Sequence, residues 1–339
     1  CNMVLGLNKD NVAFWESTAN QFIETVYKDM MKNIYAGALY KTGRNAEAAE
    51  IFAEQGDYNS LMTQFYKRRS YEAIRQEYLR NPNAGALPFL LQDFVNNSQE
   101  AVDGAEGGKL FVRDIKQTEA MQMVQFAGQV VKEGKTNNPA MWKAAQGWLE
   151  YLFGKKQQGY QDIQQAIHMV GSEHAQLTAR LIHFYIKSDI APLNNQFDTW
   201  LTEELKWFKD PDKHHWFKDA AMTRTVNQIL SKKYESRTNT LLGLYNVTGN
   251  GNFSTQTETM KVEDLEKFLQ YAKGVSDNPL DAYLIANIYY DSTDMDDLVG
   301  TKHLRVCQWE QAIPWLERVP VAFYNKQHFS IYAINRSVD

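Results

Sequence analysis

The chain has 339 residues and a formal net charge of −5, with 44% hydrophobic and 13% aromatic residues. This composition supplies a sizeable core and excludes a disordered chain, and the mixing of acidic with basic residues leaves no cationic stripe for nucleic acid. The two cysteines, Cys1 and Cys307, predict neither a disulfide framework nor a cysteine-rich metal site, and no apolar run reaches the ~18 residues of a transmembrane segment.

The first residue, Cys1, leaves two localisations open. A mature bacterial lipoprotein begins with a lipidated cysteine, so the chain can belong to the cell envelope, anchored through Cys1. The apolar run 3–7 differs from the polar tether that usually follows such a cysteine. The alternative is a soluble fragment of a longer chain, which the missing helix stop in 331–339 also favours.

Helical periodicity begins near the N-terminus, and the alternating β-branched runs of strands are missing. We expect helices at 11–31, 34–41, 46–55, 60–67, 71–79 and 87–95. Gly43 supplies the turn after the second of them. The glycine-rich run 102–109 predicts a boundary, because each glycine destabilises a helix by ~1 kcal/mol relative to alanine. Residues 1–103 are therefore predicted to form N-terminal helical hairpins.

The second part, residues 104–339, is predicted to be a helical array continuous with the first. We expect helices at 118–132, 140–153, 160–170, 172–187, 197–209, 216–232, 236–245, 262–273 and 280–290. Pro139 and Pro279 each follow an asparagine and open a helix, where the missing N–H would have no partner. Residues 246–259, with Gly249 and Gly251, predict a loop.

One spacing of side chains recurs on three predicted helices. It is found in Asn45, Ala48, Phe52 and Gln55, in Tyr160, Ile163, Ile167 and Val170, and in Trp309, Ala312, Leu316 and Val319. These positions share one face of a helix. We expect the face that begins at Trp309 to pack on the preceding predicted helix, 280–290.

The three segments resemble the second helix of a tetratricopeptide hairpin. Gly43 stands where that family has its turn glycine, and residues 35–40 resemble the small-and-aromatic pattern of its first helix. The resemblance implies an all-α fold, an α–α superhelix of stacked antiparallel helix hairpins, that binds partners and catalyses no reaction. The segments are not separated by multiples of the family's repeat length, and the first two lack its terminal proline. A non-repeating helical domain with chance spacing is the alternative.

No catalytic residue, metal ligand or cofactor is predicted. The seven histidines (His168, His174, His183, His214, His215, His303 and His328) lack metal-ligand spacing and are interpreted as ordinary surface or core residues. The acidic cluster Asp291, Asp294, Asp296 and Asp297 is interpreted as a solvated loop or an N-terminal helix cap. No phosphate-binding loop or nucleophile elbow is present. Carboxylates are abundant, but nothing in the sequence selects a catalytic pair.

A duplicated aromatic motif supplies the candidate binding site. Trp207 and Phe208 precede Pro211, and Trp216 and Phe217 follow it, each pair continuing with Lys-Asp. Such rings can form a platform for a peptide or a sugar. The alternative, which we favour, is a hydrophobic staple that closes a corner between two helices.

The leading hypothesis is a non-catalytic, tetratricopeptide-like scaffold that binds a protein or peptide. The alternative is a glycan-binding cell-envelope lipoprotein of the starch-utilisation type, with a tetratricopeptide-like framework. An α/α-barrel hydrolase with paired acids is the third reading. Long loops that carry exposed tryptophan would favour the glycan-binding protein, and bare helix pairs would favour the scaffold.

Overall fold

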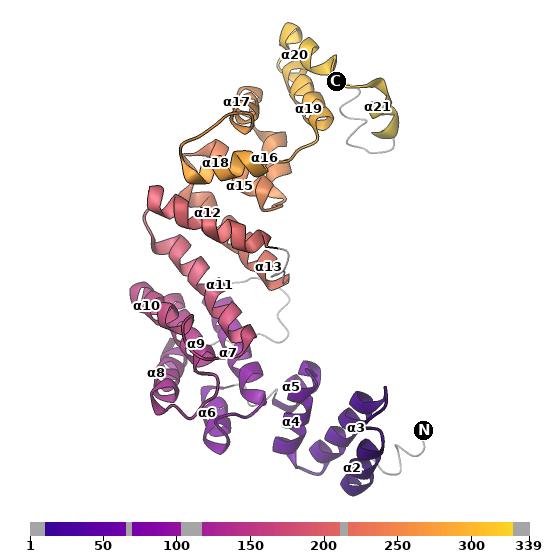
Figure 1. Ribbon diagram of the computed structural model, residues 1–339, viewed down its shortest axis with the longest axis vertical. Helices are drawn as coiled ribbons and strands as arrows, with labels where there is room; N and C mark the ends of the chain where they lie inside the picture. The colour runs from indigo at the N-terminus through magenta and orange to yellow at the C-terminus, as the bar shows by residue number, and fades with distance from the viewer. Residues whose placement is uncertain (1–10, 66–69, 103–116, 211–215, 328–339) are drawn as a thin grey trace. The chain divides into compact units, whose positions relative to one another are not determined.

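The structure is a computed structural model and describes residues 11–65, 70–102, 117–210 and 216–327 (Figure 1). Every regular element in these ranges is helical and none is a strand, so the all-α prediction is confirmed. The chain divides into two compact units, Cys1–Ile186 and Lys187–Asp339. The boundary predicted at residue 103 borders a segment, 103–116, that lies outside the described residues, so that division stays a prediction.

The first unit consists of consecutive helices that pack on one another. They are α2 (Val12–Gln21), α3 (Lys28–Lys41), α4 (Asn45–Glu54), α5 (Tyr58–Phe65), α6 (Tyr71–Arg80), α7 (Ala86–Val102), α8 (Gln117–Glu133), α9 (Pro139–Leu152), α10 (Lys156–Ala166) and most of α11 (Glu173–Ile190). The helix α3 packs on α4, α8 on α9, and α9 on α10. This arrangement is consistent with the predicted superhelix of stacked hairpins.

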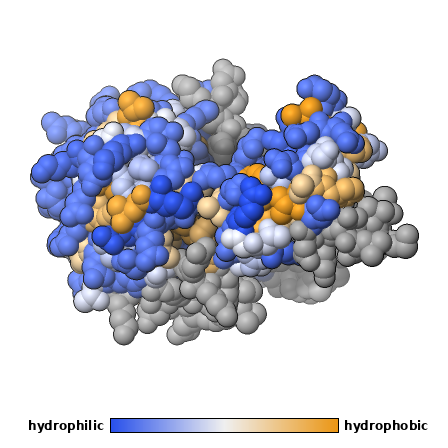
Figure 2. All heavy atoms as spheres, turned by 90° about the horizontal axis from the view of Figure 1, so that it is seen from below, coloured by the Kyte–Doolittle hydropathy of each residue, from blue (hydrophilic) through white to orange (hydrophobic). Residues whose placement is uncertain are grey.

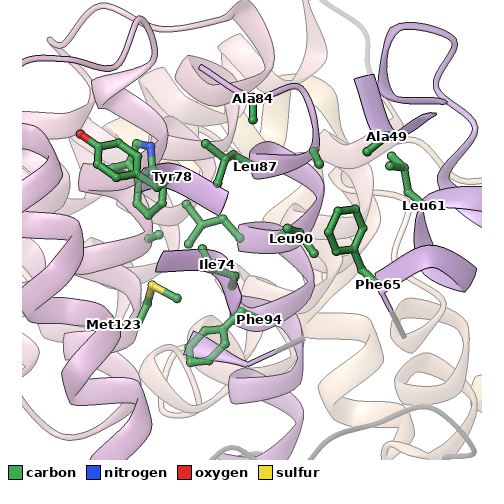
Figure 3. Close-up of a cluster of buried hydrophobic side chains, with 14 of the residues drawn as sticks. Ala49, Leu61, Phe65, Ile74, Tyr78, Ala84, Leu87, Leu90, Phe94 and Met123 are labelled. Atoms are coloured by element: carbon green, nitrogen blue, oxygen red, sulfur yellow. The ribbon is translucent and has the colours of Figure 1, made fainter. Parts of the chain in front are cut away.

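Three aromatic rings hold α6, α8 and α9 together. The ring centroids of Tyr78 and Phe126 are 5.4 Å apart, those of Tyr78 and Trp142 5.6 Å, and those of Phe126 and Trp142 5.7 Å, all edge to face. Such pairs contribute about 0.5–1.5 kcal/mol beyond the burial of their area. The same core continues in Figure 3, where Leu90 of α7 lies beside Phe65 of α5. Aromatic packing therefore links successive hairpins.

The second unit is also a chain of helices. After the end of α11 come α12 (Asn195–Lys209), α13 (Trp216–Thr225), the π-helical turn η2 (Val226–Leu230), α14 (Ser231–Lys233), α15 (Thr238–Val247), α16 (Asn252–Thr259), α17 (Val262–Ala272), α18 (Pro279–Asn287), α19 (Ser292–Arg305), α20 (Trp309–Leu316) and α21 (Val321–Gln327). The most extensive helix contact here is between α19 and α20, and α18 packs on α12 and α15.

The helix predicted over 11–31 is wrong, because α2 ends at Gln21 and α3 begins at Lys28. Between them the Thr25 hydroxyl donates to the carbonyl of Phe22 at 2.8 Å and accepts from the backbone N–H of Tyr27 at 3.2 Å. A threonine side chain that bonds nearby backbone competes with helical hydrogen bonds. The apolar stripe of 11–31 carried no sign of this local break.

The predicted loop 246–259 is also wrong in part, because α16 occupies Asn252–Thr259. The Asn250 side chain accepts from the backbone N–H of Asn252 at 3.0 Å and donates to the side chain of Asn227 at 2.8 Å. These bonds fix the chain as it enters α16. The glycines on which the prediction rested mark only the preceding turn, where Gly249 has φ +67°.

Candidate functional site

Three hairpins, α3–α4, α9–α10 and α19–α20, close with one kind of turn, which also joins α4 to α5 (Asp57 to Phe52 at 2.9 Å) and α15 to α16 (Asn250 to Tyr245 at 2.8 Å). In each hairpin, the first backbone N–H after the connection donates to a carbonyl near the end of the first helix. The bonds run from Arg44 to Leu39 at 2.9 Å, from Lys155 to Glu150 at 2.8 Å, and from Gln308 to His303 at 2.9 Å. The residue before each donor has a positive φ: Gly43 at 83°, Gly154 at 93° and Cys307 at 59°. This is the left-handed helix stop that favours glycine.

The second helix of each hairpin carries a small buried residue at the same distance from the turn. The residues are Ala48, Gly159 and Ala312. A Cβ on Gly159 would lie 2.5 Å from the carbonyl oxygen of Gly147, and a Cβ on Gly300 would lie 2.5 Å from the Leu316 side chain. The two helices of a hairpin therefore approach closely only because these positions lack side-chain bulk.

Two details of the predicted repeat need correction. In α10 the shared turn places Gly159 and Ile163, rather than the predicted Ile163 and Ile167, at the positions of Ala48 and Phe52, and Val170 lies beyond the helix and is exposed. In α20 the partner helix is α19, which the sequence analysis did not predict, rather than residues 280–290. Ala312 and Val319 are buried, as expected of that face.

Trp309 does not belong to the buried face of α20. Its side chain is 57% exposed, and Ile313, one turn later, is 54% exposed. The spacing of Trp309, Ala312 and Leu316 spans a helix face broad enough to include both the contact with α19 and its solvent edge. The expectation that Trp309 packs on the preceding helix is therefore wrong.

A buried charged cluster lies between α9 and α10. The Lys143 ammonium is 2.6 Å from Asp162 Oδ1, and Glu150 is 5% exposed. Burial, with a hydrogen bond to Asp162 and repulsion by its charge, raises the pKa of Glu150 to about 7. Glu150 Oε2 and Asp162 Oδ2 are buried acceptors without a donor, so a proton held between the carboxyl groups satisfies both.

Sequence reasoning missed this carboxyl pair, although a signal for it exists. Glu150 and His303 occupy the hairpin position that Leu39 occupies in α3–α4, each accepting the backbone bond across the turn. All three side chains are buried. An alignment of the three hairpin sequences by their turns would have placed Glu150 and His303 opposite Leu39, as polar residues at a core position. Lys143, Asp162 and Glu150 interact with one another across the hairpin, which makes the cluster a helix–helix contact.

His303 is a core histidine, in agreement with its interpretation from sequence. Its Nδ1 is 2.7 Å from Gln308 Oε1, and its Nε2 is 3.1 Å from Glu266 Oε1. Within the described part of the chain no three His, Cys, Asp or Glu side chains are grouped to hold a metal ion. His214, His215 and His328 lie outside that part.

The acidic cluster at the start of α19 divides into two roles. The Asp291 side chain accepts from the backbone N–H groups of Thr293 at 2.8 Å and Asp294 at 3.1 Å, which confirms the predicted N-terminal cap. Asp297 is buried and accepts from the Tyr324 hydroxyl at 2.8 Å. For Asp297 the prediction of a solvated loop is wrong, because the residue ties α21 to α19.

A second polar network joins four segments of the second unit. The buried Asp198 of α12 accepts from Arg237 Nη1 at 2.8 Å, from Asn278 Nδ2 at 2.6 Å and from the Tyr234 hydroxyl. Arg237 continues to Asp281 of α18 at 3.0 Å. Burial and the hydrogen bond to Asp198 raise the pKa of the Tyr234 hydroxyl, so it stays a proton donor. The network fixes how α12, α15 and α18 meet.

Two lysines of the second unit, Lys233 and Lys302, cap helix ends in the same way. The Lys302 ammonium donates to the carbonyls of Glu258 at 2.8 Å and Met260 at 2.6 Å, 44 and 42 residues earlier in the chain. Lys233 donates to the carbonyls of Asp189 and Ala191, again 44 and 42 residues earlier. A cation at a helix C-terminus satisfies its unpaired carbonyls and complements the helix dipole.

The residue that follows each capping lysine also makes a similar contact in the two places. Tyr234 follows Lys233 and bonds Asp198, on the helix after the one that Lys233 caps. His303 follows Lys302 and contacts Glu266, again on the helix after the capped one. The contacts of Lys233 and Tyr234 are therefore arranged like those of Lys302 and His303, a similarity that no spacing of apolar residues revealed.

The predicted aromatic site lies at the end of α12. Phe208 is buried, Trp207 is half-buried, and their rings meet edge to face at 5.0 Å. The Lys218 ammonium donates to the Trp207 carbonyl at 2.7 Å and lies 4.3 Å from the centroid of a Trp207 ring. The side chains of Trp216 and Phe217 lie outside the described residues, so the binding role of the four aromatic residues stays a prediction.

Most of the face seen in Figure 2 is hydrophilic. Among the exposed apolar side chains of the last hairpin are Val306, at the end of α19, and Trp309 and Ile313, one turn apart on α20; they are 55%, 57% and 54% exposed. We call these three residues the α20 ridge. Glu310 of α20 and Glu317, the residue that caps the C-terminal end of α20, are both exposed and border one edge of the ridge. No described helix is long and apolar enough to cross a membrane.

No family model, curated protein or solved structure matches this chain. The fold is all-helical, and its helix packing is compatible with a helical-repeat solenoid. The likeness of the hairpins to one another is seen within this chain alone. It consists of the shared turns, the small residues where helices cross, and the two similar lysine caps.

Proposed function

We propose that this protein is a non-catalytic, tetratricopeptide-like helical scaffold that binds a protein or peptide partner. The observation that carries the proposal is the common construction of hairpins α3–α4, α9–α10 and α19–α20, each with the same turn and a small buried residue at the same distance from it. Each such hairpin exposes apolar faces that only neighbouring hairpins or a partner can cover.

The charged clusters support a scaffold over an enzyme. Lys143 and Asp162 join α9 to α10, and Asp198 with Arg237 joins α12 to the start of α15. Each of these charged groups forms an ion pair with another side chain of the fold. An active site, in contrast, needs charged groups directed toward a bound substrate.

The position of the exposed tryptophan also favours a scaffold over a glycan-binding protein. Trp309 lies on a helix of a compact hairpin, and the connection from Val306 to Gln308 is short. Glycan-binding lipoproteins of the starch-utilisation type are expected to present aromatic residues on long loops. An envelope location through Cys1 is compatible with either function.

The proposal is tested by affinity capture from the source organism with the purified full chain as bait, followed by mass spectrometry. The candidate is then produced recombinantly, and we expect saturable binding at one stoichiometry. The same preparation is tested against polysaccharides. Saturable binding to a polysaccharide together with no protein binder would overturn the proposal in favour of the glycan-binding alternative. Turnover of a captured small molecule would overturn its non-catalytic part.

A further inference from the structure

We propose that the α20 ridge docks a short basic amphipathic helix of a partner protein, which adds to the stack in the place of a following helix. This inference rests on the proposed scaffold function and names its partner class and its surface. It is argued from the hairpins that share the turn of α19–α20.

In hairpins α3–α4 and α9–α10, the residue at the same distance from the turn as Ile313 is covered by a helix that comes later in the chain. In α3–α4 this residue is Ala49, which is 1% exposed and lies beside Leu61 of α5 (Figure 3). In α9–α10 it is Tyr160, which stacks on the ring of His183 of α11 with centroids 5.5 Å apart. A helix is therefore the natural occupant of this face.

Among the described residues, no following helix covers this position in the hairpin α19–α20. The helix that follows, α21, is tied to α19 by the hydrogen bond from Tyr324 to Asp297. Ile313 remains 54% exposed, and Trp309 one turn earlier is 57% exposed. A tryptophan and an isoleucine on adjacent turns present a large rigid apolar surface, and aromatic anchors of this kind dominate binding energy at interfaces.

The border of the ridge indicates the charge of the occupant. Glu310 of α20 and Glu317 at its C-terminal cap lie on one side of the ridge, both exposed. A helix that covers Trp309 and Ile313 brings its own edge next to these carboxylates, so lysine or arginine there complements them. Complementary charge at the rim sets partner choice and association rate.

The test uses the full chain and two fluorescently labelled synthetic peptides that form helices. The first has leucines on one face and lysines along its edges, and the second has glutamates in place of the lysines. Fluorescence anisotropy reports binding. We expect the lysine peptide to bind saturably and more weakly as salt rises, and the glutamate peptide to bind at least about tenfold more weakly.

Two pairs of variants locate the surface. Trp309→Ala with Ile313→Ala is expected to weaken binding of the lysine peptide about tenfold or more, whereas Tyr289→Ala, at a side chain 83% exposed elsewhere, leaves it unchanged. Glu310→Gln with Glu317→Gln is expected to flatten the salt dependence, whereas Glu263→Gln on α17 does not. Circular dichroism and melting confirm that all variants remain folded.

Four results would overturn the proposal. Equal binding by the wild type and the Trp309→Ala, Ile313→Ala variant shows that the peptide binds elsewhere. Binding that appears only after residues 328–339 are removed assigns the ridge to the chain's own C-terminal segment. Self-association that the same double variant abolishes assigns the ridge to a second copy. A natural partner that still binds the double variant leaves the scaffold function standing and removes only this surface.

Discussion

Cys307 occupies, in the turn between α19 and α20, the position that Gly154 occupies between α9 and α10. Both have a positive φ, 59° for Cys307 and 93° for Gly154, and both precede the backbone donor that closes the turn. Glycine adopts this conformation without steric cost, whereas a residue with a Cβ is strained there. Cys307 is the one non-glycine residue with positive φ among the described residues.

Replacing Cys307 by glycine is therefore expected to stabilise the protein. Relief of about 1–2 kcal/mol of left-handed strain is partly offset by the larger entropy of glycine in the unfolded chain, which leaves a gain of about 0.5–1 kcal/mol. The free energy of unfolding is measured by denaturant titration. Gly154→Ala is the reciprocal variant and should destabilise by a similar amount. A lower midpoint for Cys307→Gly would contradict the shared turn.

The close crossing of α19 and α20 predicts that Ala312→Leu is destabilising. Ala312 is fully buried, so a larger side chain overpacks the contact at a cost of about 1–3 kcal/mol. Ile313→Leu, at the next and exposed position, is the matched control and should change stability by no more than about 0.5 kcal/mol. Equal midpoints for the two variants would show that α20 does not pack through this face.

The fold class followed from the sequence because helical periodicity and missing strand patterns are averaged over many residues. Positions such as Ala48 and Ala312 were identified because they recur at a fixed spacing. Thr25, whose side chain breaks a predicted helix, and Lys302, whose carbonyl partners are 44 and 42 residues away, act through single hydrogen bonds. Such bonds leave no periodic signal. The candidate binding surface was missed because Trp309 was assigned wholly to the core.

The buried Asp198 network predicts a large loss of stability when its acceptor is removed. Asp198→Ala leaves Arg237, Asn278 and Tyr234 without their shared partner, which is expected to cost about 3–5 kcal/mol. Asp296→Ala removes another Asp–Arg pair, to Arg318 at 3.3 Å, whose arginine is half-exposed. Exposed pairs of this kind contribute up to about 1 kcal/mol, so this control should remain close to the wild type. Comparable midpoints would show that the network does not hold the second unit together.

Variants at the end of α12 distinguish the two interpretations of Trp207 and Phe208, a binding platform or a hydrophobic staple. Phe208 is buried, so Phe208→Ala is expected to cost about 3–5 kcal/mol, whereas truncation of the half-buried Trp207 should cost less. Thermal melting measures both. Trp207→Ala together with Trp216→Ala should leave melting nearly unchanged if those rings are exposed binders. If the Trp207→Ala, Trp216→Ala variant unfolds, the two tryptophans are core residues and do not form a binding site.

The carboxyl pair of α9–α10 predicts a stability that depends on pH. The pKa of Glu150 is about 7 in the folded protein and near its ordinary value of 4.5 when unfolded. Between these values the folded state holds a proton that the unfolded state has released, so stability falls as pH rises from about 4.5 to about 7 and then stays level.

Glu150→Gln should remove this dependence, because an amide stays neutral and can donate to Asp162 Oδ2 as the carboxylic acid does. We expect the variant to match the wild type near pH 4.5 and to exceed it at pH 8 by about 1–2 kcal/mol, allowing for relaxation around the pair. Denaturant midpoints are compared across this range, with Glu310→Gln on the exposed side of α20 as the control. If the wild type and Glu150→Gln differ by the same amount at both ends, Glu150 is ionised in the folded protein and no proton joins it to Asp162.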